Sequence, residues 1–306
     1  MDWTLFAISC TRIATNSFGV VANVLLIYLV LKRTPKELAT YSILLFNFGI
    51  SDLFACSSAL FVQPRIVTAN QNMYLFYYGP CKFFGSMVCL IGFGSMVHSC
   101  GYTLWILVFS FAYRYYVLHN AVPRKCTVVV LLILMYLPSL STFVIFSASS
   151  SNADDVKSAI QEETGYNITS ECVSGYLNVY EWKKLIPVLY VVLPIVPFYC
   201  IILILRKLTM SKLSASRTLS EHSRLLHSQL LKALTVQAIM PSFFVIGCIL
   251  YVIGQLDIIH HPYLEYYTSF ALEFLAMLNP FTSLYFIRPY RTWISRNLSK
   301  AYACKK

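Results

Sequence analysis

Seven long apolar stretches constrain the fold of this chain more than any other feature of its sequence. A bilayer hydrocarbon core of about 30 Å needs roughly 20 residues of apolar helix to cross it. The stretches that reach this length run approximately over residues 13–31, 41–63, 83–113, 126–148, 185–205, 233–255 and 266–287. Because they are continuously apolar and do not alternate with period two, they predict membrane helices and not barrel strands.

The composition agrees with a bilayer as solvent. The chain is 58% hydrophobic and 12% charged, with a mean hydropathy of +0.63, which argues against an ordinary soluble domain. We therefore expect one all-α integral membrane domain over residues 1–306, a seven-transmembrane helix bundle. Its major connections would be a second outer loop at 147–184, a third inner loop with an extension of the sixth helix at 206–232, and a tail at 288–306.

The cations are distributed unevenly between the two sets of loops. Eighteen of the 24 Lys and Arg residues fall in alternate loops and after residue 287, and the net charge of +11 is therefore one-sided. The positive-inside rule then predicts an extracellular N-terminus and a cytosolic C-terminus. The same cations would attract anionic lipid of the bilayer, and nucleic acid is not an expected partner.

Two features of the outer loops accompany this topology. Asn167 begins an N-glycosylation sequon, Asn-Ile-Thr, in the second outer loop. Cys10, Cys81 and Cys172 are the cysteines expected on the oxidising side. We expect a disulfide between Cys81 and Cys172 that ties the long loop to the bundle and leaves Cys10 free; the alternative is three free thiols.

Polar residues inside the spans mark candidate functional positions. Asp52 and Glu273 are the acids within the seven stretches, and an ionisable group at membrane depth usually faces a partner or a hydrated cavity. Asn23 in the first stretch, Asp52 in the second and Asn279 in the seventh have depths that would let them share one polar cluster.

These polar positions and their neighbours carry a family resemblance. With an Arg closing the third span in FSFAYRYYVLHN and an Asn-Pro in the seventh, the pattern resembles rhodopsin-like G-protein-coupled receptors. The segments YSILLFNFGISDLF, QLLKALTVQAIMPSFF and NPFTSLYFIRPYR are more closely similar to nematode serpentine chemoreceptors, of serpentine receptor class delta. The resemblance implies a chemosensory receptor that binds a small odorant or pheromone from outside and activates a cytosolic heterotrimeric G protein.

The resemblance also implies a switch at the cytosolic end. Arg114 would contact the G protein, with Tyr113 where many such receptors have an acid, so a salt-bridge lock is doubtful. The alternative for Arg114 is a snorkelling cation, and prolines in the sixth and seventh spans could be structural kinks only. The predicted coupling and switch residues are Arg114, Tyr113, Gln237, Pro241, Asn279, Pro280 and Tyr285.

Depth along the helices predicts the ligand site at their outer halves. An aromatic cavity with few polar groups there would suit a small, largely apolar molecule. Glu273 could pair with a ligand cation or form a hydrogen bond inside the bundle. The predicted ligand contacts are Gln63, Phe84, Met87, Leu90, Phe93, Tyr190, Tyr251, Tyr267, Phe270 and Glu273.

Other functions compete with signalling, because a fold does not specify a function. A ligand-gated channel or transporter is the alternative, although neither repeated halves nor several intramembrane charges are visible. Paired carboxylates and metal-spaced His and Glu are lacking in the spans, so an enzyme, a metal site and a cofactor are not expected. The expected location is the plasma membrane as a multi-pass protein, with the sensory cilium implied by the family.

Overall fold

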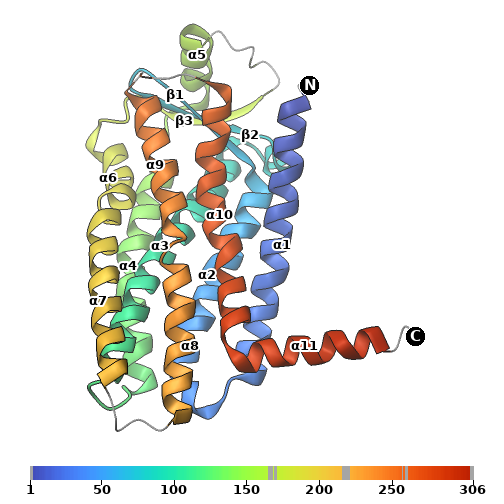
Figure 1. Cartoon of the computed structure of the whole chain (residues 1–306). Helices are drawn as coiled ribbons and strands as arrows, with labels where there is room; N and C mark the ends of the chain where they lie inside the picture. The colour runs from blue at the N-terminus through green and yellow to red at the C-terminus, as the bar shows by residue number, and fades with distance from the viewer. Residues whose placement is uncertain are drawn as a thin grey trace.

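The computed structural model of the protein describes residues 3–164, 168, 171–215, 221–256, 258 and 261–303. Long helices run side by side as a bundle, a small β-sheet with a short helix covers one end, and a last helix leaves the other end sideways (Figure 1). These ends are called the sheet end and the α11 end below.

The bundle helices are α1 (Trp3–Arg33), α2 (Tyr41–Val62), α3 (Ser86–Val117), α4 (Lys125–Ala148), α6 (Trp182–Val192), α7 (Ile195–Ala215), α8 (Glu221–Gln237), α9 (Pro241–Gln255) and α10 (Pro262–Phe286). The shorter elements are η1 (Lys36–Leu38), η2 (Pro80–Phe84), α5 (Ala153–Thr164) and α11 (Arg288–Ala303). Within the described residues, six helical spans are long and apolar enough to cross a membrane, and α10 with α11, bent by 88°, brings the number to as many as seven. The predicted seven-helix membrane fold is thereby confirmed.

Two spans consist of helix pairs, and proline stands at both breaks. The α6–α7 pair is interrupted at residues 193–194, directly before Ile195, and Pro194 is the second of them. The α8–α9 pair is interrupted after Gln237, and α9 begins at Pro241. A proline lacks the backbone N–H that would continue the helical hydrogen-bond ladder, which explains a break just before it. Pro280, by contrast, lies inside α10 without ending it.

The sheet joins two loops that are far apart in the sequence. Strands β1 (Pro64–Ala69) and β2 (Asn72–Tyr77) form an antiparallel hairpin, and β3 (Cys172–Tyr176) pairs antiparallel with β2. Asn70 in the hairpin turn has φ 51°, a left-handed conformation that asparagine tolerates better than most residues. In the register, Leu75 stands opposite Ile66 on one side and Ser174 on the other.

Both faces of this sheet are covered, which holds it in place over the bundle. Met73 and Leu75 pack toward α3, whereas Tyr74 and Phe76 pack on the other face under α5. Successive side chains of a strand point to opposite faces, so β2 can contribute to both apolar clusters. The sheet thus closes the space above the bundle helices (Figure 1).

The position of Arg12 corrects the predicted start of the first span. The first predicted span begins at residue 13 and so excludes Arg12, but α1 begins at Trp3 and Arg12 is buried within it. In the region of the third inner loop and sixth-helix extension, α7 continues to Ala215 and α8 begins at Glu221.

Candidate functional site

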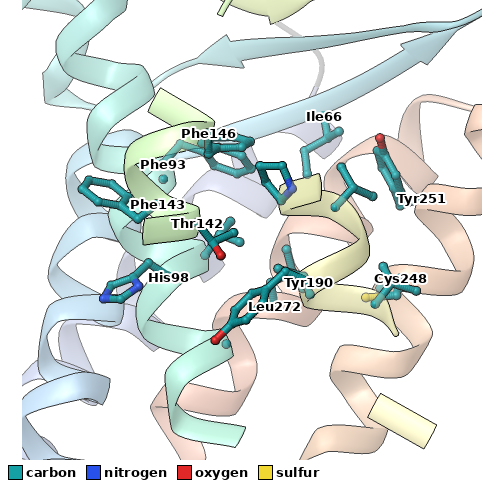
Figure 2. Close-up of a pocket in the computed structure, with 18 of the residues that line it drawn as sticks. Ile66, Phe93, His98, Thr142, Phe143, Phe146, Tyr190, Cys248, Tyr251 and Leu272 are labelled. Atoms are coloured by element: carbon teal, nitrogen blue, oxygen red, sulfur yellow. The ribbon is translucent and has the colours of Figure 1, made fainter. Parts of the chain in front are cut away.

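A cavity of about 110 Å³ lies inside the bundle below the sheet. Its walls come from β1, β2, α3, α4, α6, α9 and α10, and Figure 2 shows their side chains converging on it from several helices. The lining residues are Ile66, Met73, Phe93, Gly94, Val97, His98, Gly101, Ser139, Thr142, Phe143, Phe146, Pro187, Val188, Tyr190, Val191, Val192, Gly247, Cys248, Tyr251, Thr268 and Leu272.

The cavity walls are predominantly apolar and aromatic, with a few polar groups. His98 Nδ1 and Ser139 Oγ lie 2.8 Å apart, so these two groups satisfy each other. The Tyr251 hydroxyl is buried and has no hydrogen-bond partner among the described residues. An apolar cavity of roughly 150 Å³ binds benzene. This one, at about 110 Å³, is somewhat smaller, so its room is for a small organic molecule of at most about that size.

The structure places three of the predicted ligand contacts, Phe93, Tyr190 and Tyr251, in the cavity wall. The prediction for Phe84 and Met87 is corrected, because both point away from the bundle, with Phe84 68% exposed. Depth along the sequence does not show which side of an element faces the bundle.

Four further predicted contacts lie elsewhere. Leu90 is buried in the packing of α3 against the sheet, and Gln63 forms the left-handed C-cap of α2. Tyr267 and Phe270 line a separate groove of about 310 Å³ between the ends of α1 and α10. None of these four residues borders the cavity in the described part of the structure.

Glu273, the remaining predicted contact, has a partner inside the protein. Its carboxylate forms an ion pair with Arg12 of α1 and accepts a hydrogen bond of 2.7 Å from Asn16 Nδ2. Arg12 Nη1 also donates to the Pro64 carbonyl oxygen over 2.7 Å. Both side chains of the pair are almost fully buried, at 3% and 2% exposure. The carboxylate therefore holds α1, α10 and β1 together and is not free to meet a ligand cation.

The expected polar cluster forms in part. Asn279 Nδ2 donates to Asp52 Oδ2 over 3.0 Å, and Thr103 Oγ1 donates to Asp52 Oδ1 over 2.9 Å. Asn23 does not join them; its Nδ2 donates to the carbonyl oxygens of Gly19 and Ala276. Asp52 thus links α2 to α3 and α10, and Asn23 links α1 to α10.

Arg114 lies in the last turn of α3, near the α11 end of the bundle, and it is only 3% exposed. Its guanidinium carbon lies 3.7 Å from the centre of the Tyr41 ring, and Tyr113 packs against the same ring at 5.8 Å. Within the described part of the chain, the Arg114 Nε and Nη2 groups have no hydrogen-bond partner and Arg114 forms no ion pair. An aromatic face therefore stands where an acid would otherwise neutralise this cation.

The other predicted switch residues divide into buried and exposed positions. Gln237 Nε2 lies 3.4 Å from both the Asn279 carbonyl oxygen and Ser283 Oγ, so it links the break in α8–α9 to α10. Tyr285 points outward and is 62% exposed. Tyr290 of α11, by contrast, is fully buried, and its hydroxyl lies 2.7 Å from Thr34 Oγ1. Sequence spacing gave no sign of Tyr290, because it follows the bend between α10 and α11.

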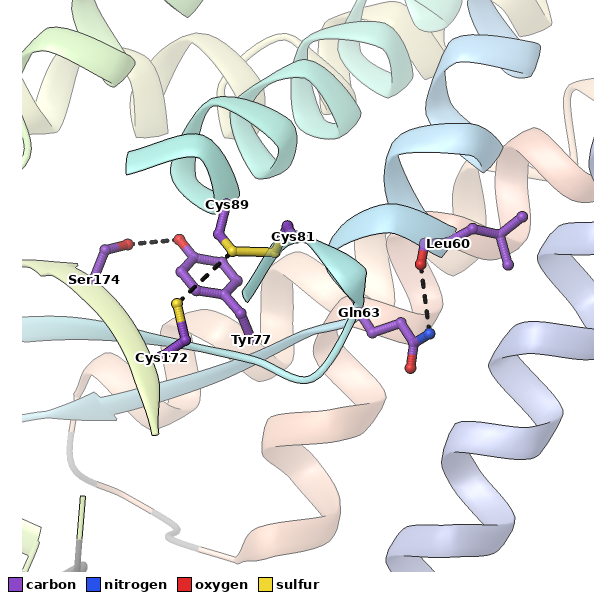
Figure 3. Close-up of a disulfide and its surroundings, with 7 residues drawn as sticks. All are labelled: Leu60, Gln63, Tyr77, Cys81, Cys89, Cys172 and Ser174. Atoms are coloured by element: carbon purple, nitrogen blue, oxygen red, sulfur yellow. Dashed lines mark hydrogen bonds between the residues drawn. A yellow bond between two sulfur atoms is a disulfide. The ribbon is translucent and has the colours of Figure 1, made fainter. Parts of the chain in front are cut away.

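The predicted Cys81–Cys172 disulfide is wrong in this structure, which pairs Cys81 with Cys89. The η2 turn brings Cys81 over the first turn of α3, where the two Cα atoms are 5.1 Å apart, within the usual range for a disulfide. Cys172 of β3 remains a thiol, with its sulfur 3.9 Å from that of Cys89 (Figure 3). Cys10 is also free, as expected, and it is exposed.

This pairing predicts which outer cysteines react with a membrane-impermeant maleimide. Without reductant, the exposed Cys10 and the partly buried Cys172 should both be modified while Cys81 and Cys89 are protected, as peptide mass spectrometry would show. Burial raises the pKa of the Cys172 thiol, so its modification should be slow at neutral pH and accelerate as pH rises. In a Cys172→Ser variant Cys81 should stay protected, because its partner Cys89 is unchanged. Modification of Cys81 in this variant would show that Cys81 pairs with Cys172 in the unmodified receptor.

Two site predictions receive no support or contradiction from the fold. Asn167 lies outside the described residues. Among those that are described, no group of three or more His, Cys, Asp or Glu side chains could hold a metal ion.

The arrangement of helices defines the class of protein. The crystal structure of squid rhodopsin superposes with a TM-score of 0.71, covering 100% of this chain and 88% of the rhodopsin chain. The sequence identity of that match is 13%, so it shows the fold alone. The protein therefore has the rhodopsin-like seven-helix fold.

Sequence comparison identifies the family within that class. Residues 8–296 match the family described as serpentine type 7TM GPCR chemoreceptor Srd. The chain is 34% identical over 284 residues to serpentine receptor class delta-19 of Caenorhabditis elegans, covering 91% of this chain and 84% of the relative. It is 32% identical over 291 residues to class delta-18 of the same organism, covering 93% and 86%. The chain belongs to the Srd family, a multi-pass membrane chemoreceptor of the G-protein-coupled receptor type, which confirms the resemblance.

Proposed function

We propose that the chain binds a small organic ligand in the cavity below the sheet and activates a heterotrimeric G protein at the α11 end. In this proposal the sheet end faces the outside of the plasma membrane and the α11 end faces the cytosol. The concentration of Lys and Arg in the loops and tail of the α11 end supports that orientation.

The observation that carries the proposal is that one helix, α3, borders the cavity and also bears an arginine whose donors have no partner among the described residues. Helix α3 contributes Phe93, His98 and Gly101 to the cavity and carries Arg114 in its last turn, at the other end of the bundle. The cavity has space for a ligand, and Arg114 has unpartnered donors for an acceptor on a protein partner. A shift of α3 against its neighbours would couple the two sites.

The break between α8 and α9 supplies a second movable element. Gln237 and Pro241 bracket it, and Cys248 and Tyr251 of α9 line the cavity. A ligand that displaces α9 would therefore act on α8, which packs against α3 and α10 toward the α11 end. This is a two-state switch in which the ligand favours one arrangement of the helices.

Gly101→Val tests the cavity as the ligand site. A Cβ added at Gly101 would meet no atom within 4 Å, so the larger side chain projects into open space and not into packed neighbours. Ligand-driven second-messenger output in cells should fall at least ~10-fold in potency, with Gly101→Ala intermediate. Replacing glycine within a helix also favours folding by up to about 1 kcal/mol, so expression should not suffer.

Val130→Leu is the matched control, because it adds a methylene group on the exposed side of α4. Its response should equal that of the unmodified receptor at the same surface level. An unchanged response of Gly101→Val would place the ligand outside the cavity.

A further inference from the structure

A second, smaller hollow adjoins the cavity on the side of the sheet. It has a volume of about 20 Å³, and its lining residues are Ile66, Thr68, Leu250, Tyr251, Gly254, His261, Leu264, Glu265 and Thr268. Ile66, Tyr251 and Thr268 line both spaces, so the two meet at these residues. A water molecule needs roughly 10–15 Å³ of such space, and the hollow therefore has room for one small polar group.

The Tyr251 hydroxyl lies at the upper edge of the cavity, toward Ile66 (Figure 2). It is buried and has no hydrogen-bond partner among the described residues, although its ring lines both the cavity and the hollow. A buried hydroxyl without a partner is unfavourable, and a ligand group bonded to it would recover the lost hydrogen-bond free energy.

The charges close to these spaces are already neutralised. Of the described residues that line the cavity, none is Asp, Glu, Lys or Arg. Glu265 of the hollow is bound by Arg65, with Nη2 at 2.6 Å and Nε at 2.7 Å from Oε2. His261 Nδ1 accepts the Tyr263 backbone N–H at the start of α10. An ionised ligand would lose its hydration without gaining a counter-ion, which costs several kcal/mol.

We infer, building on the proposed function of the same cavity, that its ligand is an uncharged molecule with a roughly benzene-sized apolar body and a single hydroxyl or carbonyl group. The apolar body occupies the 110 Å³ cavity, and the polar group reaches the hollow and bonds the Tyr251 hydroxyl. Small aromatic or alicyclic alcohols, aldehydes and ketones belong to this class, whereas amines and carboxylic acids of the same size, being ionised at neutral pH, do not.

Four probes with one ring and different side groups test this inference on purified full-length receptor in lipid nanodiscs. Toluene presents the apolar body alone, benzyl alcohol adds the hydroxyl, and benzoate and benzylammonium add a charge of either sign. Ligand-observed NMR titrations should rank benzyl alcohol tightest and toluene next. Both ions should bind at least ~100-fold more weakly than benzyl alcohol, as expected for an unpaired buried charge.

Tyr251→Phe isolates the proposed hydrogen bond, because it keeps the ring and removes only the hydroxyl. Benzyl alcohol should bind about 3- to 10-fold more weakly to this variant, the usual value of one neutral hydrogen bond, while toluene binding stays the same. Gly101→Val should remove the binding of both probes. Equal binding of the ions, an equal loss for both neutral probes in Tyr251→Phe, binding that survives Gly101→Val, or no binding at all would each overturn the inference.

The binding measurement contains no G protein, so it separates the ligand class from signalling. Receptor that shows the expected ranking but gives no G-protein response to any of the probes or their larger neutral homologues in cells would support the ligand class and count against the proposed function. A G-protein response in cells that depends on charged compounds would support the proposed function and count against the ligand class.

Discussion

Replacing Glu273 by Leu is expected to lower the stability of the folded receptor by about 3–5 kcal/mol. The substitution leaves the Arg12 guanidinium buried with the Pro64 carbonyl oxygen and without its carboxylate, and an uncompensated buried charge has a cost of that size. Arg12→Met should have a comparable effect by stranding the carboxylate. Thermal denaturation monitored by size-exclusion chromatography in detergent would measure the loss.

The double variant Arg12→Met/Glu273→Leu should recover most of this stability, because an apolar pair of similar volume needs no neutralisation. Glu181→Gln is the matched control. Glu181 pairs with Lys184 at the surface and is 55% exposed, and such a pair contributes at most about 1 kcal/mol of stability. If Glu273 instead served a ligand cation, Glu273→Leu would retain its stability and lose only the ligand response. A double variant less stable than either single one would also contradict the internal pair.

Replacing Arg114 by Ala should abolish G-protein activation while leaving ligand binding in the cavity intact. Its Nε and Nη2 donors have no partner among the described residues, and the variant removes them without touching a cavity residue. Ligand-dependent nucleotide exchange on a purified G protein should fall by at least ~100-fold. Undiminished exchange at equal receptor concentration would leave Arg114 a structural cation only.

Tyr41 provides a separate test of how Arg114 is held at rest. A desolvated cation–π contact is worth about 2 kcal/mol, equivalent to a roughly 30-fold change in an equilibrium between two states. Tyr41→Leu should therefore raise ligand-independent activity, up to that factor, whereas Tyr41→Phe keeps the ring face and should stay near the original level. Equal basal activity in the two variants would show that the ring does not restrain Arg114.

The spans, the membrane class and the family could be predicted from sequence because each depends on long or specific patterns. About 20 apolar residues are enough to identify a membrane helix, and the surroundings of Asp52, Arg114 and Asn279 resemble one family. The contact between Asp52 and Asn279 also agrees with their predicted depths.

Helix rotation and chain pairing could not be obtained in this way. Phe84 and Phe93 have similar chemistry and nearby depths, yet only the one that faces inward lines the cavity. Arg12 lies just before the apolar stretch of its helix, so the length of that stretch excludes it from the span. Its partner Glu273 can be recognised from the sequence as an acid within a span, but the sequence does not show which cation pairs with it. The Cys81–Cys89 pair depends on the η2 turn, and a short turn of this kind has no hydrophobic periodicity from which it could be predicted.

The three-stranded sheet has a consequence for receptor engineering. Its middle strand comes from residues 72–77 and hydrogen-bonds on one side to its own hairpin and on the other to residues 172–176 of a distant loop. Chimeras that exchange only one of these loops with a relative would pair mismatched side chains between β2 and β3, for example opposite Ser174 or Gly175. Exchanging both loops together preserves the complementary surfaces, so the two segments should be transplanted as one module.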